Sequence, residues 1–221
     1  MQIRFERNRT STIIVMYSLY LYFLGLSLRN TSRALQPLSN RSYVSIWKWI
    51  QKFSSFPVYR RRRVSSFIID ETMIKIERKH FWIWICIEPV HKTILGIHLS
   101  QARNMLVARQ FLESLIQKYG RHPVYSDGGT WYPEACKVLE LRHYLHSPLE
   151  KSLVERVMQY FKDRTECFND YYPCSKIDCD NSHVYNWIEL FVSMYNNIIV
   201  TKNNPVLTKA LIISSVNRAE K

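Results

Sequence analysis

The sequence predicts an α/β fold, in which a mixed β-sheet with flanking helices follows a small all-α module. Residues 64–99 contain three runs rich in β-branched and aromatic residues, separated by short joins, as expected of consecutive antiparallel strands. From about residue 104 onward, helical and strand patterns alternate, and before residue 54 apolar residues recur at helical spacing. A chain of 221 residues is long enough for one full-size domain and a small appended module.

Three short helices are predicted in the N-terminal module. The first spans residues 12–24, the second begins at the capping residues 30–32 and ends at Leu35, and the third follows Ser42. A short helix, a turn and a basic amphipathic helix are typical of a helix-turn-helix that enters the major groove of DNA. Three small helices with a Trp-rich core also occur in protein-interaction modules. In the third helix an apolar face is predicted at Val44, Trp47, Ile50 and Phe53, and the other faces carry Arg41, Ser45, Lys48 and Lys52.

The positive charge is concentrated at the N-terminal end. The chain has a formal charge of +13 and a pI near 9.6. Residues 1–69 contain twelve Lys and Arg and a single acid, a net charge of +11, whereas residues 70–221 have a net charge of only +2. This asymmetry indicates a module that binds a polyanion, joined to a body with another role. The run that follows the third helix is either a solvated tether or a strap that contacts phosphates; it comprises Arg60, Arg61, Arg62 and Arg63.

The body follows a strand and helix order of βββαβαβα. Strands are predicted at residues 64–76, 81–87, 93–99, 123–126 and 142–145. Helices are predicted at residues 104–119, which Gly120 closes, at 131–139, and from Pro148 to about 168. A later stripe, Trp187, Phe191, Met194 and Tyr195, is expected to be core packing.

Two other interpretations of the sequence are not favoured. The apolar run at residues 13–28 is short for a membrane span and is interrupted by Tyr and Ser, so a buried helix is expected and no membrane association. The spacings of Cys167, Cys174, Cys179 and His183 do not match the close ligand pairs of zinc sites.

Three acids occupy positions where carboxylates could act together. Asp70 lies within the apolar first strand, where burial is costly unless the acid is paired or binds a metal. Strand alternation places Glu71 on the opposite face. Asp127 ends the fourth strand and precedes two glycines, a pattern that fits either an ordinary turn or a ligand site. Glu155 and Lys162 share one face of the late helix with Gln159.

These motifs together resemble the DDE transposases of prokaryotic insertion sequences. The resemblance consists of the element order, Asp-Glu-Thr at residues 70–72, Tyr-Ser-Asp-Gly-Gly-x-Trp-Tyr at 125–132, and Glu-Arg-x5-Lys-Asp-Arg-Thr at 155–165. It covers residues 25–197. It implies a ribonuclease H-like catalytic domain preceded by a helix-turn-helix, and an enzyme that cleaves DNA strands and joins them to a target.

The resemblance also implies roles for single residues. Asp70, Asp127 and Glu155 would be the catalytic, metal-binding triad, with Lys162 and Arg164 contacting DNA. Two Mg²⁺ or Mn²⁺ ions would be bound, because in-line phosphodiester cleavage without a protein nucleophile suits two divalent cations held by carboxylates. Glu150 is the rival third acid. The interval from Asp127 to Glu155 is shorter than in the commonest groups of the family.

The organisation expected from this resemblance has four parts. They are a helix-turn-helix domain at residues 1–56, a basic linker at 57–63, the DDE domain at 64–200 and a tail at 201–221. The expected partners are terminal inverted repeats, target DNA and a second copy of the chain, in a dimer or larger oligomer. The protein is expected in the cytoplasm, at the nucleoid. The alternative is a catalytically inactive DNA-binding protein derived from a transposase.

Overall fold

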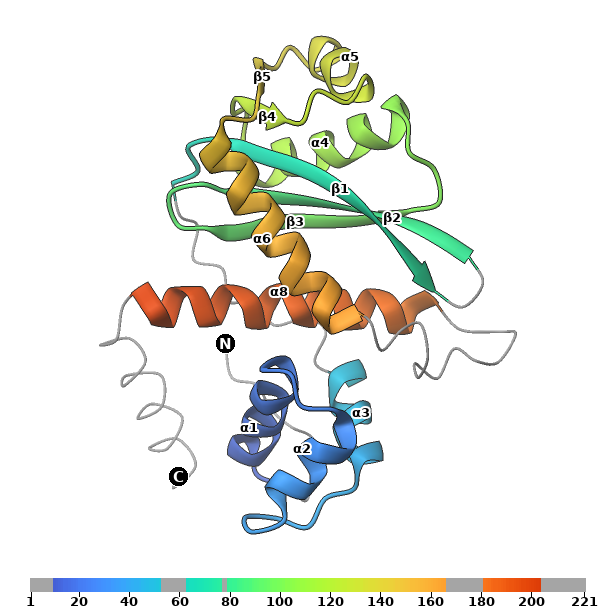
Figure 1. Ribbon diagram of the computed structural model, residues 1–221, viewed down its shortest axis with the longest axis vertical. Coiled ribbons are helices and arrows are strands. Elements are labelled where there is room, and N and C mark those ends of the chain that lie inside the picture. The colour runs from blue at the N-terminus through green and yellow to red at the C-terminus, as the bar shows by residue number, and fades with distance from the viewer. Residues whose placement is uncertain (1–9, 53–62, 77–78, 166–180, 204–221) are drawn as a thin grey trace. The chain divides into compact units, whose positions relative to one another are not determined.

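The computed structural model describes residues 10–52, 63–76, 79–165 and 181–203 (Figure 1). The chain divides into two compact units, each of which is described here by itself. One comprises residues 1–56 together with 186–221, and the other comprises residues 57–185. None of the helices within the described ranges is both long and apolar enough to cross a membrane.

The first unit contains the three predicted N-terminal helices, α1 (Thr12–Phe23), α2 (Leu28–Leu35) and α3 (Tyr43–Lys52). The second helix begins earlier than predicted, because Ser27 is its N-cap and accepts a hydrogen bond from the Asn30 N–H at 3.1 Å. The third helix begins as predicted, with the Ser42 hydroxyl accepting from the Ser45 N–H at 3.3 Å.

The buried face of α3 differs from the predicted one. Ile50 is buried as predicted, but the other buried residues are Ile46 and Trp49, whereas Val44 is 42% exposed. Both this set and the predicted one are apolar at helical spacing, so the choice between them depends on which face meets α1 and α2. The prediction for Phe53 falls outside the described residues.

The aromatic stripe of α8 (Asn181–Asn203) packs as predicted, and it does so within the first unit. Trp187 and Phe191 are fully buried. The Trp187 indole N–H donates to the Tyr22 hydroxyl at 3.0 Å, and the Trp187 and Phe23 ring centroids lie 5.6 Å apart. Residues from Asn186 onward therefore group with the N-terminal helices, although the expected boundaries place residues up to 200 in the DDE domain.

A five-stranded mixed sheet forms the centre of the second unit, with the strand order β3-β2-β1-β4-β5. The long strands β1 (Phe67–Ile76), β2 (Lys79–Glu88) and β3 (Thr93–Ser100) pair antiparallel, and the short strands β4 (Val124–Ser126) and β5 (His143–Leu145) continue the sheet in parallel from β1. The helices are α4 (Met105–Tyr119), α5 (Trp131–Val138) and α6 (Pro148–Thr165). This arrangement confirms the predicted element order and the ribonuclease H-like fold class.

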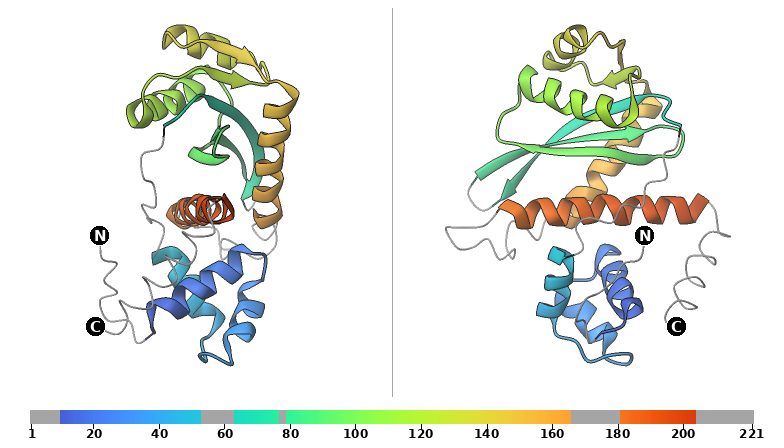
Figure 2. Two further views of the ribbon diagram at one scale, coloured as in Figure 1. Left: turned by 90° about the vertical axis from the view of Figure 1, so that its left-hand side faces the viewer. Right: turned by 180° about the vertical axis from the view of Figure 1, so that it is seen from behind.

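The two faces of the sheet are covered by different helices. Helices α4 and α5 cover one face, where Phe67, Ile69, Trp84 and Cys86 belong to a buried cluster with residues of both helices. Helix α6 lies against β1 on the opposite face, as Figure 2 shows most clearly in its left view. Since successive side chains of a strand point to opposite faces, even-numbered residues of β1 face α6 and odd-numbered residues face α4 and α5.

Glu88, to which the sequence assigned no role, stabilises the turn between β2 and β3. Its side chain is 2% exposed and accepts hydrogen bonds from the Ser65 hydroxyl at 2.8 Å and from the His91 N–H at 2.5 Å. Burial alone would raise the pKa of Glu88, but these hydrogen bonds to the ionised form lower it below the ordinary glutamate value. The charged form is therefore the stabilising one.

We expect Glu88→Gln to destabilise the fold by about 1–3 kcal/mol at neutral pH, the range for hydrogen bonds to a charged group. A group whose pKa is lowered on folding contributes stability above its unfolded pKa and loses that contribution as the pH falls through the folded pKa. Urea unfolding of both proteins between pH 3 and 8 measures the difference. It should shrink below about pH 4.5, and a difference that stays constant across this range would contradict the prediction.

Candidate active site

The parallel pairing of β1 with β4 brings Asp70 beside Asp127. In the register of these strands Ile68 lies opposite Tyr125, so the two aspartates follow at equivalent positions along neighbouring strands. Possible ligand oxygens of Asp70, Glu71 and Asp127 all lie within 4.8 Å of one another. Two acids that are 57 positions apart in the sequence therefore form one cluster at the carboxyl end of β4, where sheets of this kind build their sites.

The pKa of Asp70 is strongly raised by its surroundings in this cluster. Its pKa is raised from 3.8 to about 7, first because the carboxyl is buried and then because of the negative charges of Glu71 and Asp127. A hydrogen bond from the Glu71 N–H to Asp70 Oδ1 at 2.9 Å and the charge of Arg103 act in the opposite direction. A carboxyl group in this state gains most from a nearby cation.

The loop after β4 holds Asp127 in a defined turn. Asp127 is exposed, and its Oδ1 accepts from the Gly129 N–H at 3.0 Å. Gly128 has φ +85°, a conformation that favours glycine, and a Cβ at Gly129 would lie 2.7 Å from the Trp131 ring. Both glycines are therefore explained by the backbone conformation and packing of the turn, as the ordinary-turn interpretation expects. The same turn leaves Asp127 exposed, so it is also compatible with a ligand there.

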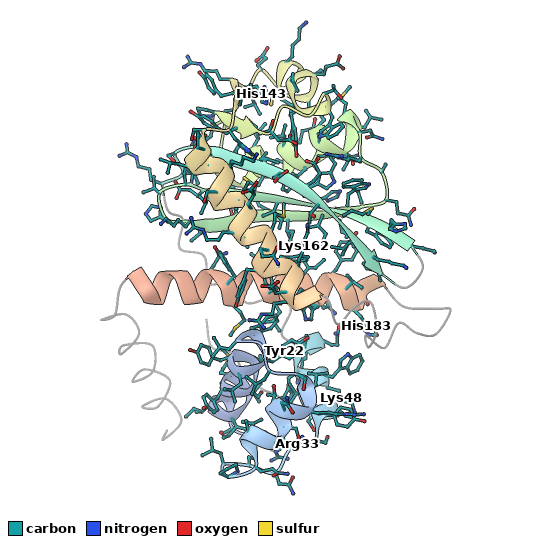
Figure 3. All side chains as sticks on the ribbon, in the orientation of Figure 1. Tyr22, Arg33, Lys48, His143, Lys162 and His183 are labelled. Carbon is teal, nitrogen blue, oxygen red and sulfur yellow. The ribbon has the colours of Figure 1, made fainter. Side chains whose placement is uncertain are left out.

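Helix α6 contributes the opposite wall of an open pocket of about 610 Å³ that reaches Asp70. The predicted shared face is confirmed, because Glu155, Gln159 and Lys162 all line this pocket; Figure 3 labels Lys162 on α6. Glu155 is 61% exposed and its Oε1 lies 4.0 Å from Lys151 Nζ. It stands outside the 4.8 Å cluster, so the structure gathers two of the three predicted triad residues closely and places the third across the pocket.

The rival acid Glu150 has a local structural role. The Ser147 N–H donates to Glu150 Oε2 at 2.7 Å, and the Glu150 N–H donates to Ser147 Oγ at 3.4 Å. This reciprocal pair is a capping box at the start of α6. Glu150 does not line the pocket described above.

Three residues at the cluster were not assigned a role from the sequence. Arg103 donates from Nε to Glu71 Oε1 at 2.7 Å, and its Nη2 forms an ion pair with the same oxygen at 2.6 Å. The Tyr132 hydroxyl donates to Glu71 Oε2. Tyr132 is part of the motif after β4, whereas nothing near Arg103 in the sequence marks it. As predicted, Glu71 points to the sheet face opposite α6, where Tyr132 belongs to the buried cluster.

Two histidines flank Asp127 from the β5 side. His143 Nε2 lies 2.8 Å from Ser126 Oγ, and His146 Nε2 lies 3.1 Å from the Tyr125 carbonyl oxygen. Burial lowers the pKa of both imidazoles, which favours their neutral forms beside Asp127.

The remaining predicted DNA-contacting residues belong to α3, to the segment just before it, to the arginine run that follows it and to α6. Lys48 and Lys52 are exposed on α3, and Arg41 and Ser45 are partly buried near its start. Arg63 is exposed, while Arg60, Arg61 and Arg62 lie outside the described residues, as do Cys167, Cys174 and Cys179. The Arg164 guanidinium lies 5.1 Å from the Tyr160 ring centroid.

Comparisons with known proteins identify the second unit. Residues 64–171 match the family model of the DDE domain of IS240-type transposases. An uncharacterized protein of Methanocaldococcus jannaschii, MJ0017, is 32% identical over 195 residues, which cover 87% of this chain and 89% of the relative.

Among solved structures, the catalytic core of BIV integrase is 20% identical, over 56% of this chain and 79% of the integrase chain, with a TM-score of 0.42. The catalytic core of HTLV-2 integrase in complex with magnesium is 14% identical, over 57% and 83%, also with a TM-score of 0.42. The matched family model agrees with the observed strand order and with the positions of the motifs on β1, β4 and α6. Residues 64–171 therefore form a DDE transposase domain of the IS240 type.

Proposed function

We propose that this protein is an active transposase that binds the ends of its insertion sequence, cleaves DNA strands there and joins them to a target. The observation that carries the proposal is the pairing of Asp70 with Asp127 across β1 and β4, opposite a helix wall with Glu155 and Lys162. An acid pair on rigid strands opposite a cation is suited to a phosphodiester substrate.

The residues present fit a divalent metal ion. Carboxylate oxygens are the ligands that Mg²⁺ and Mn²⁺ prefer, and the raised pKa of Asp70 marks a cluster with more negative charge than Arg103 neutralises. In our proposal Asp70, Asp127 and Glu155 hold two such ions. Bound there, the ions would supply the positive charge that activates the attacking oxygen and stabilises the leaving oxygen. The ammonium of Lys162 would orient a phosphate of the cleaved strand from α6.

The proposed partners follow from the charge distribution. The N-terminal module would bind the terminal inverted repeats, through Arg41 just before α3, Ser45, Lys48 and Lys52 on α3, and the run Arg60–Arg63 after it. Since both ends of an element must be joined to one target, we propose that two or more copies of the chain act together on DNA. Such a protein would work at the nucleoid, in the cytoplasm.

The proposal is tested with purified protein and linear DNA that carries the sequence flanking its gene. We expect Mg²⁺- or Mn²⁺-dependent nicking at the element ends and joining to a plasmid target, with both activities abolished by EDTA. End binding without nicking, across a titration of both metals, would instead identify an inactive DNA-binding derivative.

The role of α3 is tested by Lys48→Ala and Lys52→Ala. Each lysine that contacts a phosphate releases about one counterion, so each substitution should lower the slope of log affinity against log salt by about one. Fluorescence anisotropy with end DNA at several salt concentrations measures this slope. Lys118→Ala, on α4 of the other unit, is the control, and equal slopes for all four proteins would argue for a protein-interaction module.

A further inference from the structure

Glu71 and its hydrogen-bond partners Arg103 and Tyr132 form a group beside Asp70 and Asp127, which we call the Glu71 bracket. The Glu71 side chain is fully buried, and both of its oxygens accept hydrogen bonds, one from Arg103 and the other from the Tyr132 hydroxyl. Glu71 lies within the acidic cluster and lines the pocket. Because both of its oxygens already accept hydrogen bonds, it is less available than Asp70 or Asp127 as a metal ligand.

Glu71 and its two partners come from three separate parts of the chain. Arg103 lies between β3 and α4, Tyr132 lies on α5, and Glu71 lies on β1. The Arg103 guanidinium carbon is 4.5 Å from the Trp82 ring centroid and 4.2 Å from that of Trp131. These cation–π contacts and the ion pair with Glu71 together fix the position of the Arg103 guanidinium.

The bracket connects to both candidate ligands through the protein's own hydrogen bonds. On one side, the Glu71 N–H donates to Asp70 Oδ1 at 2.9 Å. On the other side, the Tyr132 N–H donates to the Gly129 carbonyl oxygen at 3.0 Å, and the Gly129 N–H donates to Asp127 Oδ1 at 3.0 Å. The bond between Tyr132 and Glu71 closes this chain between the two aspartates.

We propose that Glu71, held by Arg103 and Tyr132, is a positioning residue that sets the spacing of Asp70 and Asp127 for a divalent cation. The inference rests on the proposed function, since it needs a metal at this cluster. Partners that orient metal ligands in this way typically change metal affinity by about 10–100-fold when they are removed.

Tyr132→Phe tests the inference, because it removes the hydroxyl donor and keeps the ring in the core. Tyr119→Phe is the matched control: Tyr119 is a partly buried tyrosine of the same unit, and its hydroxyl donates to the Leu95 carbonyl oxygen at 2.9 Å. Binding of Mn²⁺ is measured by calorimetry, and strand cleavage is measured as a function of Mn²⁺ concentration. We expect Tyr132→Phe to raise both the dissociation constant and the half-saturating concentration by about 10–100-fold, with cleavage restored at high Mn²⁺, and Tyr119→Phe to match the wild type.

A purely structural role gives a different result. It would lower cleavage at every Mn²⁺ concentration without moving the half-saturation point, and that outcome would overturn the inference, as would a Tyr132→Phe protein with wild-type metal affinity. Arg103→Lys, which keeps the charge but removes the second N–H to Glu71, replaces Tyr132→Phe if the latter does not melt cooperatively. If the wild-type protein bound no Mn²⁺, the proposed function itself would be wrong. If the wild type bound Mn²⁺ and Tyr132→Phe bound it equally well, only the positioning role of Glu71 would be wrong.

Discussion

Asp70→Asn is expected to abolish strand cleavage and joining while leaving the binding of element ends intact. Asparagine keeps the size of the side chain but removes the charge that would hold a divalent cation beside Asp127. We expect a loss of about 10³-fold or more in the cleavage rate, which corresponds to about 4 kcal/mol of transition-state stabilisation. Cleavage is followed on labelled end DNA, and end binding is followed by anisotropy. The basic residues proposed to bind the ends lie in the N-terminal module, so binding serves as the internal control.

The same substitution should make the metal-free protein more stable. Burial and the charges of Glu71 and Asp127 raise the pKa of Asp70 to about 7, so the folded state retains a proton that the unfolded chain releases from about pH 3.8 upward. Stability is therefore lost as the pH rises through this window and stays low above it. In EDTA at pH 8, Asp70→Asn should gain about 1–3 kcal/mol over the wild type, and the gain should vanish near pH 4.

Urea unfolding at these two pH values measures the gain. A variant that lost activity and stability together would indicate that Asp70 is an ordinary structural residue, whereas loss of activity with a gain in stability is the pattern of a site built for a ligand. Addition of Mn²⁺ should stabilise the wild type but not Asp70→Asn, because binding to the folded state alone shifts the unfolding equilibrium.

The sequence predicted the features that depend on local signals. Helix α4 begins after the cap Asn104, whose side chain accepts from the Val107 N–H, and ends at Gly120 with φ +88°. The alternation of residues along β1 correctly predicted that Asp70 and Glu71 lie on opposite faces of the sheet. Capping groups and strand parity are properties of a few neighbouring residues, so a single sequence is enough to detect them.

The features that the sequence missed depend on distant parts of the chain. Glu71 is separated from Arg103 by 32 positions and from Tyr132 by 61. The residue types at these positions do not indicate that the three side chains form hydrogen bonds with one another. The buried face of α3 was misassigned for a related reason, since Val44 and Ile46 are equally apolar and only the packing of the helices distinguishes them. The grouping of Trp187 with Tyr22 and Phe23 likewise joins the two ends of the chain.

Glu155→Gln and Glu150→Gln form a matched pair that tests the third proposed ligand. Glu155 faces the pocket of Asp70 and Lys162 and is mostly exposed, so its replacement should cost about 10³-fold in cleavage and almost nothing in stability. Glu150 belongs to the capping box of α6, a role that Gln also fills, so Glu150→Gln should cleave at close to the wild-type rate. Glu150→Ala, which removes the box, should lose about 0.5–1 kcal/mol in urea unfolding and retain cleavage.

The reverse pattern would assign the third ligand to Glu150. In that case Glu150 would bind the metal through its other oxygen, or would release the Ser147 N–H when metal and DNA bind. Loss of cleavage in both variants, with both proteins folded, would indicate that the two acids act together. Cleavage by Glu155→Gln at the wild-type rate would leave only the Asp70 and Asp127 pair, and the pocket wall of α6 would then serve DNA binding through Lys162 alone.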